Sequence, residues 1–194
     1  MTSRNVLTYE DYAALPHDGK RYELHEGELS QMGAPSARHQ LIIGNLYFIL
    51  RVHVVATGRG QLFLSPFDCI MSDITVVQPD LVYVDETRRR LLSERALEGA
   101  PTLAVEILSP WSRHIDRGVK MRLYAKHAVD WYWIVDGDAL TIDAYRLEGD
   151  GYRLDARLEG TRSRALPPFP NLPLDPATIW SGAIRGDEDD IHEH

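Results

Sequence analysis

Residues 102–136 read TLAVEILSPWSRHIDRGVKMRLYAKHAVDWYWIVD, and this stretch decides the fold class. Residues 102–108 form an apolar, β-branched run that predicts a strand, and WYWIVD at 131–136 predicts another. Between them, residues 113–127 carry apolar side chains at helical spacing, which predicts a helix. A strand, a helix and a second strand favour a mixed α/β domain, and the pattern alone leaves open whether the two strands are parallel.

The flanking sequence extends this unit in both directions. Thr8, with an acidic residue three positions later, and Ser36 are typical helix N-caps, and Glu26-Gly27 is typical of a hairpin turn. The predicted elements are a helix from Thr8 to Pro16, a hairpin over 21–32, a helix from Ser36 to about 55, strands over 61–70, 74–84, 140–147 and 151–158, and a short helix over 176–181.

These elements predict an α/β protein with a mixed α+β sheet, flanking helices and an N-terminal helix-hairpin-helix section. No repeat or low-complexity linker divides the chain, so we expect one domain over residues 1–185. The remaining residues, 186–194, are predicted to be a disordered acidic tail. The tail's His192 and His194 could bind a metal, but on an acidic tail of this kind they are more often incidental.

The 194 residues include 21 Lys and Arg against 29 Asp and Glu, a formal net charge of −8. This balance excludes a protein that coats nucleic acid by bulk positive charge. It does not exclude a local basic groove, because five of the acids lie in the last eight residues. Residues 86–126 instead carry nine basic side chains against five acidic ones, a local charge of +4.

The sequence predicts a cytoplasmic protein with no membrane segment. Its start lacks the apolar core of a secretory signal, and its longest apolar run, residues 41–50, is short and contains Asn45. The single cysteine, Cys69, cannot form an internal disulfide. We interpret it as a buried core thiol rather than a reactive one.

Two acidic residues interrupt runs that otherwise predict buried strands. Glu106 lies between Val105 and Ile107, and Asp80 follows Pro79 at the start of another apolar run. A buried carboxylate is costly unless it is paired, bound to a metal or protonated. Two acids at one end of adjacent strands could share Mg²⁺. Alternatively, Asp80 is a solvated strand-end residue and Glu106 is neutralised by a buried arginine.

The helix predicted over 113–127 carries a polar stripe beside an apolar one. Asp116, Lys120 and Tyr124 are four residues apart, so they share one face. If the neighbouring apolar stripe packs on the sheet, Lys120 could reach past the strand end toward Glu106. The alternative is a simple Asp116–Lys120 pair on the helix surface.

The series of residues 105–136 and the segments YELHEGELSQMGAPSARHQLIIGNL and VVQPDLVYVD resemble the Uma-two endonuclease family, within the PD-(D/E)XK restriction-endonuclease-like superfamily. The resemblance covers about residues 8–150. It implies a restriction-endonuclease-like core and a metal-dependent phosphodiesterase. Asp80 matches the PD acid and Glu106 the second acid, and the backbone carbonyl of Ile107 would be a further metal ligand. Leu108 stands where the superfamily has lysine, and the resemblance places that lysine at Lys120.

The resemblance also implies roles for two upstream residues. Glu23 could approach the metal directly or through water, or it is solvated on the outer face of its hairpin. His39 could contact phosphate or relay a proton, or it simply bonds the loop before its helix. Glu23, His39, Asp80, Glu106 and Lys120 are thus the candidate catalytic residues, and Asp80, Glu106 and Ile107 the metal ligands.

The resemblance implies Mg²⁺-dependent hydrolysis of a phosphodiester, with DNA as the expected substrate, Mn²⁺ as a substitute ion and a possible homodimer. Lys120 would orient the attacking water, so Lys120→Ala and Glu106→Gln should abolish activity and leave the fold intact. The alternative is a nuclease-fold module that binds a metal, nucleic acid or protein partner without cleavage. Trp131, Tyr132 and Trp133 could stack on bases, but inside a strand they are expected to be core residues. Motifs for a nucleophilic serine hydrolase or a phosphate-binding loop are missing from the sequence.

Overall fold

The computed structural model describes residues 6–16 and 18–182, so the predicted tail at 186–194, including His192 and His194, lies outside the described residues. The elements, in chain order, are α1 (Tyr9–Ala13), β1 (Arg21–His25), β2 (Glu28–Met32), α2 (Ala37–Thr57), β3 (Gln61–Leu64), β4 (Asp68–Ser72), β5 (Thr75–Val77), β6 (Leu81–Val84), η1 (Arg89–Leu91), β7 (Ala96–Leu97), β8 (Leu103–Ile107), α3 (Arg113–Ile115), η2 (Asp116–Lys120), α4 (Met121–Lys126), β9 (Trp131–Asp136), β10 (Thr141–Glu148), β11 (Gly151–Leu158), β12 (Arg164–Ala165), β13 (Pro173–Leu174) and α5 (Pro176–Ile179).

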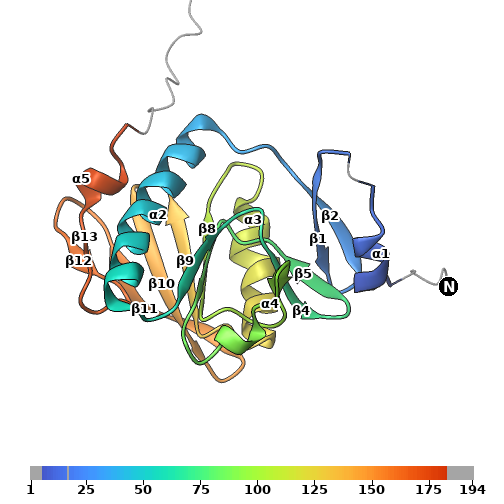
Figure 1. The fold of residues 1–194 in the computed structure, drawn as a ribbon. Helices are drawn as coiled ribbons and strands as arrows, with labels where there is room; N and C mark the ends of the chain where they lie inside the picture. The colour runs from blue at the N-terminus through green and yellow to red at the C-terminus, as the bar shows by residue number, and fades with distance from the viewer. Residues whose placement is uncertain (1–5, 17, 183–194) are drawn as a thin grey trace, which may run out of the picture.

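A six-stranded mixed sheet forms the centre of the protein, with strand order β11-β10-β9-β8-β6-β3 (Figure 1). Strands β8 and β9 are parallel, which answers the question that the sequence pattern left open. The helical segment α3–η2–α4 connects them, as the strand-helix-strand prediction requires. Strand β6 pairs with the other edge of β8 and runs antiparallel to it.

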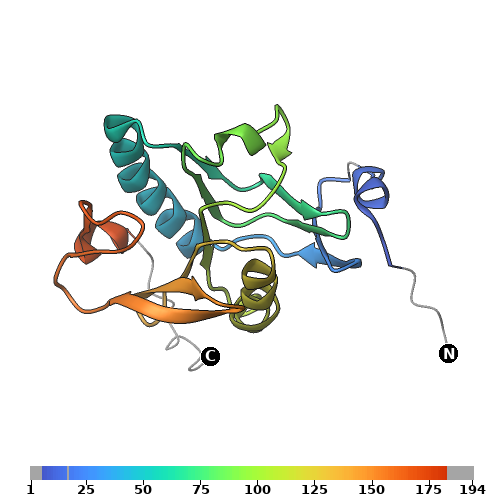
Figure 2. The same cartoon turned by 90° about the horizontal axis from the view of Figure 1, so that it is seen from below.

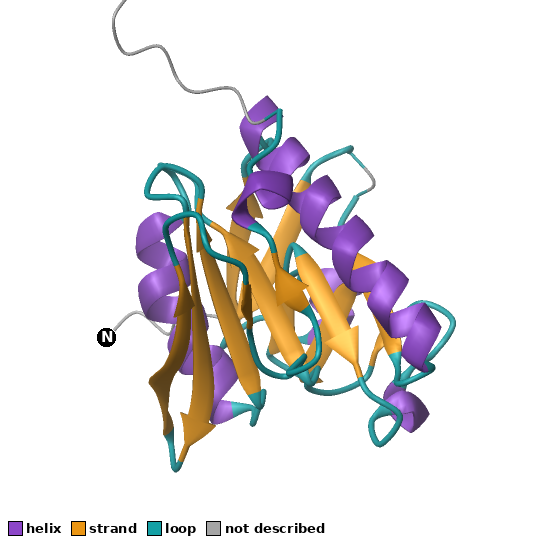
Figure 3. Ribbon diagram, turned by 90° about the vertical axis from the view of Figure 1, so that its left-hand side faces the viewer, coloured by secondary structure: helices purple, strands orange, loops and turns teal. Residues whose placement is uncertain are grey.

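Helices cover both faces of this sheet, which gives a three-layer α/β architecture (Figures 2 and 3). On one face, α2 packs its apolar residues Ile42, Leu46 and Leu50 into a core shared with the C-terminal segment. On the other face, α4 packs Leu123 against a second core that includes the fully buried Cys69. Burial raises the pKa of the Cys69 thiol well above its usual value, so the interpretation of Cys69 as a core thiol is confirmed.

A second, five-stranded sheet, with order β2-β1-β5-β4-β7, corrects two of the predicted strands. The strand predicted over 61–70 is two strands, β3 and β4, and the one predicted over 74–84 is β5 and β6. In both cases the first and second halves belong to different sheets. Pro66 and Pro79 lie at the breaks, where a residue without a backbone N–H cannot continue the ladder.

Both predicted N-caps are present. The Thr8 side chain accepts a hydrogen bond from the backbone N–H of Asp11, whose carboxylate in turn accepts from Thr8, and this capping box starts α1. The Ser36 hydroxyl accepts from the backbone N–H of His39 and starts α2. Figure 1 shows α1 and the β1–β2 hairpin on the side of the molecule opposite α5.

Helix α2 is long and apolar enough to cross a membrane by length and composition alone. Core helices of soluble proteins meet the same criterion, so this is weak evidence for a membrane segment. The expectation of a protein without a membrane segment stays a prediction. In this fold one face of α2 lies in the core, with Leu46, Leu50 and Val54 buried, while Phe48 and Val52 are exposed.

Candidate active site

The register between β6 and β8 brings the two interrupting acids together. Leu81 lies opposite Val105 in an antiparallel pair, so Asp80, just before β6, and Glu106, near the end of β8, reach the same end of the sheet. The Asp80 carbonyl accepts the backbone N–H of Ser65 at 3.1 Å, which continues the pairing of β6 with β3 and fixes the backbone from which the Asp80 side chain projects. Neither acid is solvated as a strand-end residue would be, since Asp80 is 9% exposed and Glu106 is 4% exposed.

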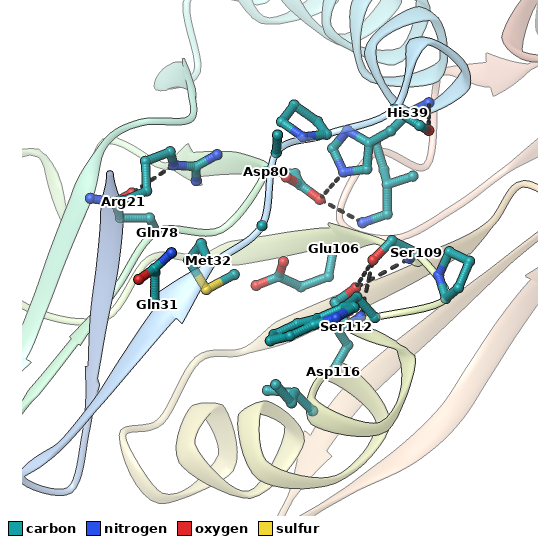
Figure 4. A pocket seen from close by; sticks show the side chains of 18 residues that line it. Arg21, Gln31, Met32, His39, Gln78, Asp80, Glu106, Ser109, Ser112 and Asp116 are labelled. Atoms are coloured by element: carbon teal, nitrogen blue, oxygen red, sulfur yellow. Dashed lines mark hydrogen bonds and ion pairs between the residues drawn. The ribbon is translucent and has the colours of Figure 1, made fainter. Parts of the chain in front are cut away.

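Asp80 is held by two groups from different elements. Its Oδ2 accepts the backbone N–H of Ile107 at 2.8 Å and lies 3.0 Å from Nε2 of His39 (Figure 4). His39 is positioned by the first turn of α2, and its ring therefore points at Asp80 rather than at the loop preceding the helix. The structure therefore brings His39, Asp80 and Ile107 together, and the group of Ile107 that contacts Asp80 is its N–H. The role of the Ile107 carbonyl as a metal ligand stays a prediction.

The basic partner of Glu106 is a lysine and not the arginine that the sequence left as an alternative. The Nζ of Lys120 lies 2.9 Å from Glu106 Oε1, and the Tyr124 hydroxyl donates to the same oxygen at 2.5 Å. Both partners come from the polar stripe of the helical segment between β8 and β9. The predicted juxtaposition of Glu106 and Lys120 is therefore present.

The orientation of that helical segment differs from the expectation. The polar stripe Asp116, Lys120 and Tyr124 is fully buried and faces inward, whereas the apolar Val119 is only partly buried. The residues Asp116–Lys120 form a π-helical turn within the helix, a feature often found at functional sites. Lys120 is fully buried, so it does not lie at the border of the apolar stripe as expected.

Glu23 joins this buried cluster from the second sheet. Its Oε1 lies 3.1 Å from Nζ of Lys120 and accepts the backbone N–H of Gln78 at 2.7 Å, while its Oε2 lies 3.0 Å from Nε2 of His25. The side chain is inaccessible to solvent, so the alternative of a solvated outer-face residue is wrong. Sequence alternation left an exposed face open for Glu23 because the second sheet, to which β1 belongs, was not predicted.

The buried charges shift one another's pKa values. Burial alone would lower the pKa of Lys120, but Glu106, Glu23 and Asp116 outweigh it and raise that pKa above its usual value. Burial also works against ionisation of Glu23, yet Lys120 and His25 lower its pKa to about 2. For Glu106 burial dominates, and its pKa rises well above the usual value despite Lys120. One lysine thus cannot fully compensate three buried carboxylates.

A cavity of about 470 Å³ opens beside the two acids. Asp80, Glu106 and His39 line it together with Asp116 and residues 33–36 of the β2–α2 loop (Figure 4). Lys120 and Glu23 are not among its lining residues in the described part of the chain. Sequence reasoning missed Arg21 and Gln78, which also line the cavity and bond each other at 3.1 Å.

The free oxygens of the two acids fit a hard divalent cation. Among the described residues, hydrogen bonds and ion pairs engage only Oδ2 of Asp80 and only Oε1 of Glu106, so Oδ1 and Oε2 are left without a protein partner. Mg²⁺ commonly binds through one or two carboxylates and completes its shell with water and substrate oxygens. Within the described ranges, no group of three or more His, Cys, Asp or Glu side chains is placed to hold a metal. Such an ion would therefore depend on this pair.

The basic segment predicted over 86–126 is largely neutralised. Most of its positive side chains form ion pairs: Arg88 with Asp130, Arg89 with Glu86, Arg113 with Asp136, Arg117 with Asp136, Lys120 with Glu106, and Lys126 with Glu26. The local charge of +4 in sequence is thus spread over several structural contacts and does not make one basic groove.

Comparison with known proteins places this chain in a family. The sequence pattern of the Uma2 family, described as "Putative restriction endonuclease", matches residues 9–177. The chain belongs to the Uma2 family. Its resemblance to that family in sequence is therefore confirmed, and membership supports a nuclease.

Two further proteins are similar to this Uma2 chain. The crystal structure of a putative nuclease belonging to DUF820 from Anabaena variabilis superposes with a TM-score of 0.75 at 21% identity, covering 92% of this chain and 99% of that one. At this identity the likeness shows the fold, which is that of a nuclease-like neighbour. An uncharacterized protein of Synechocystis sp. (strain ATCC 27184 / PCC 6803 / Kazusa) is 28% identical over 151 residues, 72% of this chain and 76% of that protein.

Proposed function

We propose that this Uma2 chain is a Mg²⁺-dependent nuclease that hydrolyses phosphodiester bonds of DNA. The observation that carries the proposal is the Asp80–Glu106 pair, with one unpartnered oxygen on each carboxylate facing a cavity beside His39. Without a cation, Asp80, Glu106 and Asp116 would repel a phosphate. A bound Mg²⁺ ion supplies positive charge to the phosphate and acidifies water.

The protein's own residues hold the two acids in place. His39 and the Ile107 N–H fix the rotamer of Asp80 from opposite elements. Lys120 and Tyr124 fix Glu106 by its Oε1, which directs Oε2 toward the cavity. Glu23 in turn holds Lys120. We therefore assign Lys120 and Glu23 as positioning residues, because neither lines the cavity in which the attacking water would lie.

The test combines a nicking assay with calorimetry. Supercoiled plasmid should be nicked in Mg²⁺ or Mn²⁺ and left intact in EDTA, and calorimetry should show cation binding. Asp80→Asn and Glu106→Gln should each abolish both the nicking and the cation binding. Asp150→Asn, at an exposed turn between β10 and β11, is the matched control and should behave as wild type. Cation-dependent nicking that survives both active-site variants would refute the assignment.

The burial of Lys120 favours a second candidate function. A lysine that does not line the cavity cannot contact water there, so the chain could instead be a nuclease-fold module that binds a cation and a partner without cleavage. The same experiment separates the two candidates. Cation binding that requires Asp80 and Glu106, without hydrolysis of any DNA or RNA form, would support the binding module.

A further inference from the structure

An exposed tryptophan lies beside the two acids. Trp111 is 73% exposed, the most exposed of the large hydrophobic side chains in the described part of the chain, and it lines the same cavity as Asp80 and Glu106. The aromatic residues considered from sequence behave differently, since Tyr132 and Trp133 are buried in the two cores. The expectation that these two are core residues is confirmed, and Trp111 is left as the aromatic surface at the site.

The turn that carries Trp111 is held closed by two serines. The backbone N–H of Ser109 donates to Oγ of Ser112 at 3.1 Å, and the backbone N–H of Ser112 donates to Oγ of Ser109 at 3.0 Å. The two hydroxyls also bond each other at 3.0 Å. These reciprocal hydrogen bonds fix the backbone around Pro110 and Trp111. The loss of conformational entropy when a ligand stacks on the indole is therefore small.

The opposite wall of the cavity offers an apolar surface and a free amide. In Figure 4, Gln31 and Met32 from β2 lie on one side of Glu106, and Ser109 and Ser112 lie on the other. The Gln31 side-chain amide has no hydrogen-bond partner among the described residues, so it can donate and accept at the edge of a planar ligand. The cavity therefore combines an aromatic ring, on which a base can stack, with an amide that can form hydrogen bonds to the edge of that base. Both lie beside the two carboxylates that are proposed to bind the cation.

The depth of the acids restricts the substrate. Asp80 and Glu106 line the cavity and are almost fully buried, whereas the phosphates of a regular duplex lie on its outer surface. A cavity of about 470 Å³ is within the size range of small-molecule sites and could accommodate a nucleotide that has left the stack. Bases freed from pairing expose both a π-face and a hydrogen-bonding edge.

We propose that the site takes an unpaired nucleotide, with the base stacked on Trp111 and its edge bonded to Gln31, so that the adjoining phosphate reaches Asp80 and Glu106. This inference rests on the proposed nuclease function and narrows it to single-stranded or locally unpaired nucleic acid. Intact duplex is then a poor substrate, because unstacking a base costs free energy that a single strand does not require.

The test measures binding separately from cleavage. Fluorescence anisotropy in Ca²⁺ compares a labelled single-stranded DNA, the same sequence as RNA, and its blunt DNA duplex. We expect the single strand to bind at least about 10-fold more tightly than the duplex. Trp111→Ala should weaken single-strand binding by about 5- to 150-fold, the range measured for loss of one base stack, and Trp111→Phe should restore most of it. The RNA arm shows whether the sugar is also discriminated.

Leu154→Ala, at a half-exposed position on the distant edge strand β11, is the matched control and should bind as wild type. Equal affinity for duplex and single strand, or unchanged binding by Trp111→Ala, would overturn the inference. Nicking of duplex that depends on Asp80 but not on Trp111 would overturn it while leaving the nuclease function in place. Trp111-dependent single-strand binding without cleavage would support it and identify a binding module.

Discussion

The Nζ of Lys120 lies 3.1 Å from Oε1 of Glu23, and this contact joins the two sheets through a buried charge. Glu23 lies on β1 of the five-stranded sheet, and Lys120 belongs to the helical segment that crosses the six-stranded sheet. The same ammonium group lies 2.9 Å from Glu106. Lys120 therefore pairs with one carboxylate from each of the two sheets, and it also holds Glu106 of the candidate active site in place.

Lys120→Ala should destabilise the protein by about 3–5 kcal/mol, because it leaves buried carboxylates without their compensating charge. The buried contacts of Lys120 thus favour a different outcome from the sequence expectation that Lys120→Ala leaves the fold intact. Urea denaturation followed by circular dichroism measures the change. Lys126→Ala removes an exposed pair with Glu26 and should cost no more than about 1 kcal/mol. Equal, small effects in both variants would show that Lys120 is not essential to the fold.

Glu23→Gln should remove part of the acid sensitivity of folding. The pKa of Glu23 in the folded protein is about 2, below its ordinary value of 4.5. A carboxylate with a lowered folded-state pKa stabilises the fold above its unfolded pKa, and this contribution is lost as pH falls toward the folded value. The stability difference between wild type and Glu23→Gln should be on the order of 3 kcal/mol near neutral pH and shrink between about pH 5 and pH 2.

Denaturant titrations at several pH values test this. Glu94→Gln, at an exposed position, serves as the control and should differ little from wild type at any pH. If the Glu23→Gln difference stayed constant from pH 2 to pH 7, the buried Glu23 charge would not contribute as described.

The sequence predicts local structure well where each segment contacts one layer. The strand at 131–136 and the helix starts at Thr8 and Ser36 depend on local periodicity and capping, and the structure confirms them. The strands predicted over 61–70 and 74–84 were wrong because each run continues in composition while the chain changes sheets. Composition does not record which sheet a strand joins.

The candidate site shows the same division. Glu106 and Asp80 are detectable from sequence because a carboxylate within an apolar run requires a compensating partner. The burial of Lys120 and Glu23 was not predictable, because it depends on a five-stranded sheet assembled from segments far apart in the chain. Trp111 does not belong to a hydrophobic repeat, so the sequence does not mark it as a site residue. Only the position of the Ser109–Ser112 turn beside the cavity shows that Trp111 lines the site.

Two glycines should respond to alanine in opposite directions. Gly60 has a φ of +120°, and an added Cβ would collide with the backbone carbonyl of Val84 on the paired strand, so Gly60→Ala should destabilise by about 1–3 kcal/mol. Gly44 lies on the exposed face of α2, and an added Cβ would have no neighbouring atom within 4 Å, so Gly44→Ala should stabilise the protein by about 0.5–1 kcal/mol. Thermal or urea denaturation distinguishes them. A stabilised Gly60→Ala would contradict the close approach of Gly60 to β6.

His39→Ala should weaken Mg²⁺ binding more than it weakens folding. The His39 ring lies 3.0 Å from Oδ2 of Asp80, which leaves Oδ1 for the cation, and loss of such a supporting contact typically costs about 10- to 100-fold in metal affinity or activity. Calorimetry measures the affinity, and the urea midpoint should change little because the ring lies at the cavity wall. His114→Ala, at an exposed position on α3 outside the cavity, should retain wild-type affinity. Wild-type Mg²⁺ affinity in His39→Ala would mean that Ile107 alone suffices to orient Asp80.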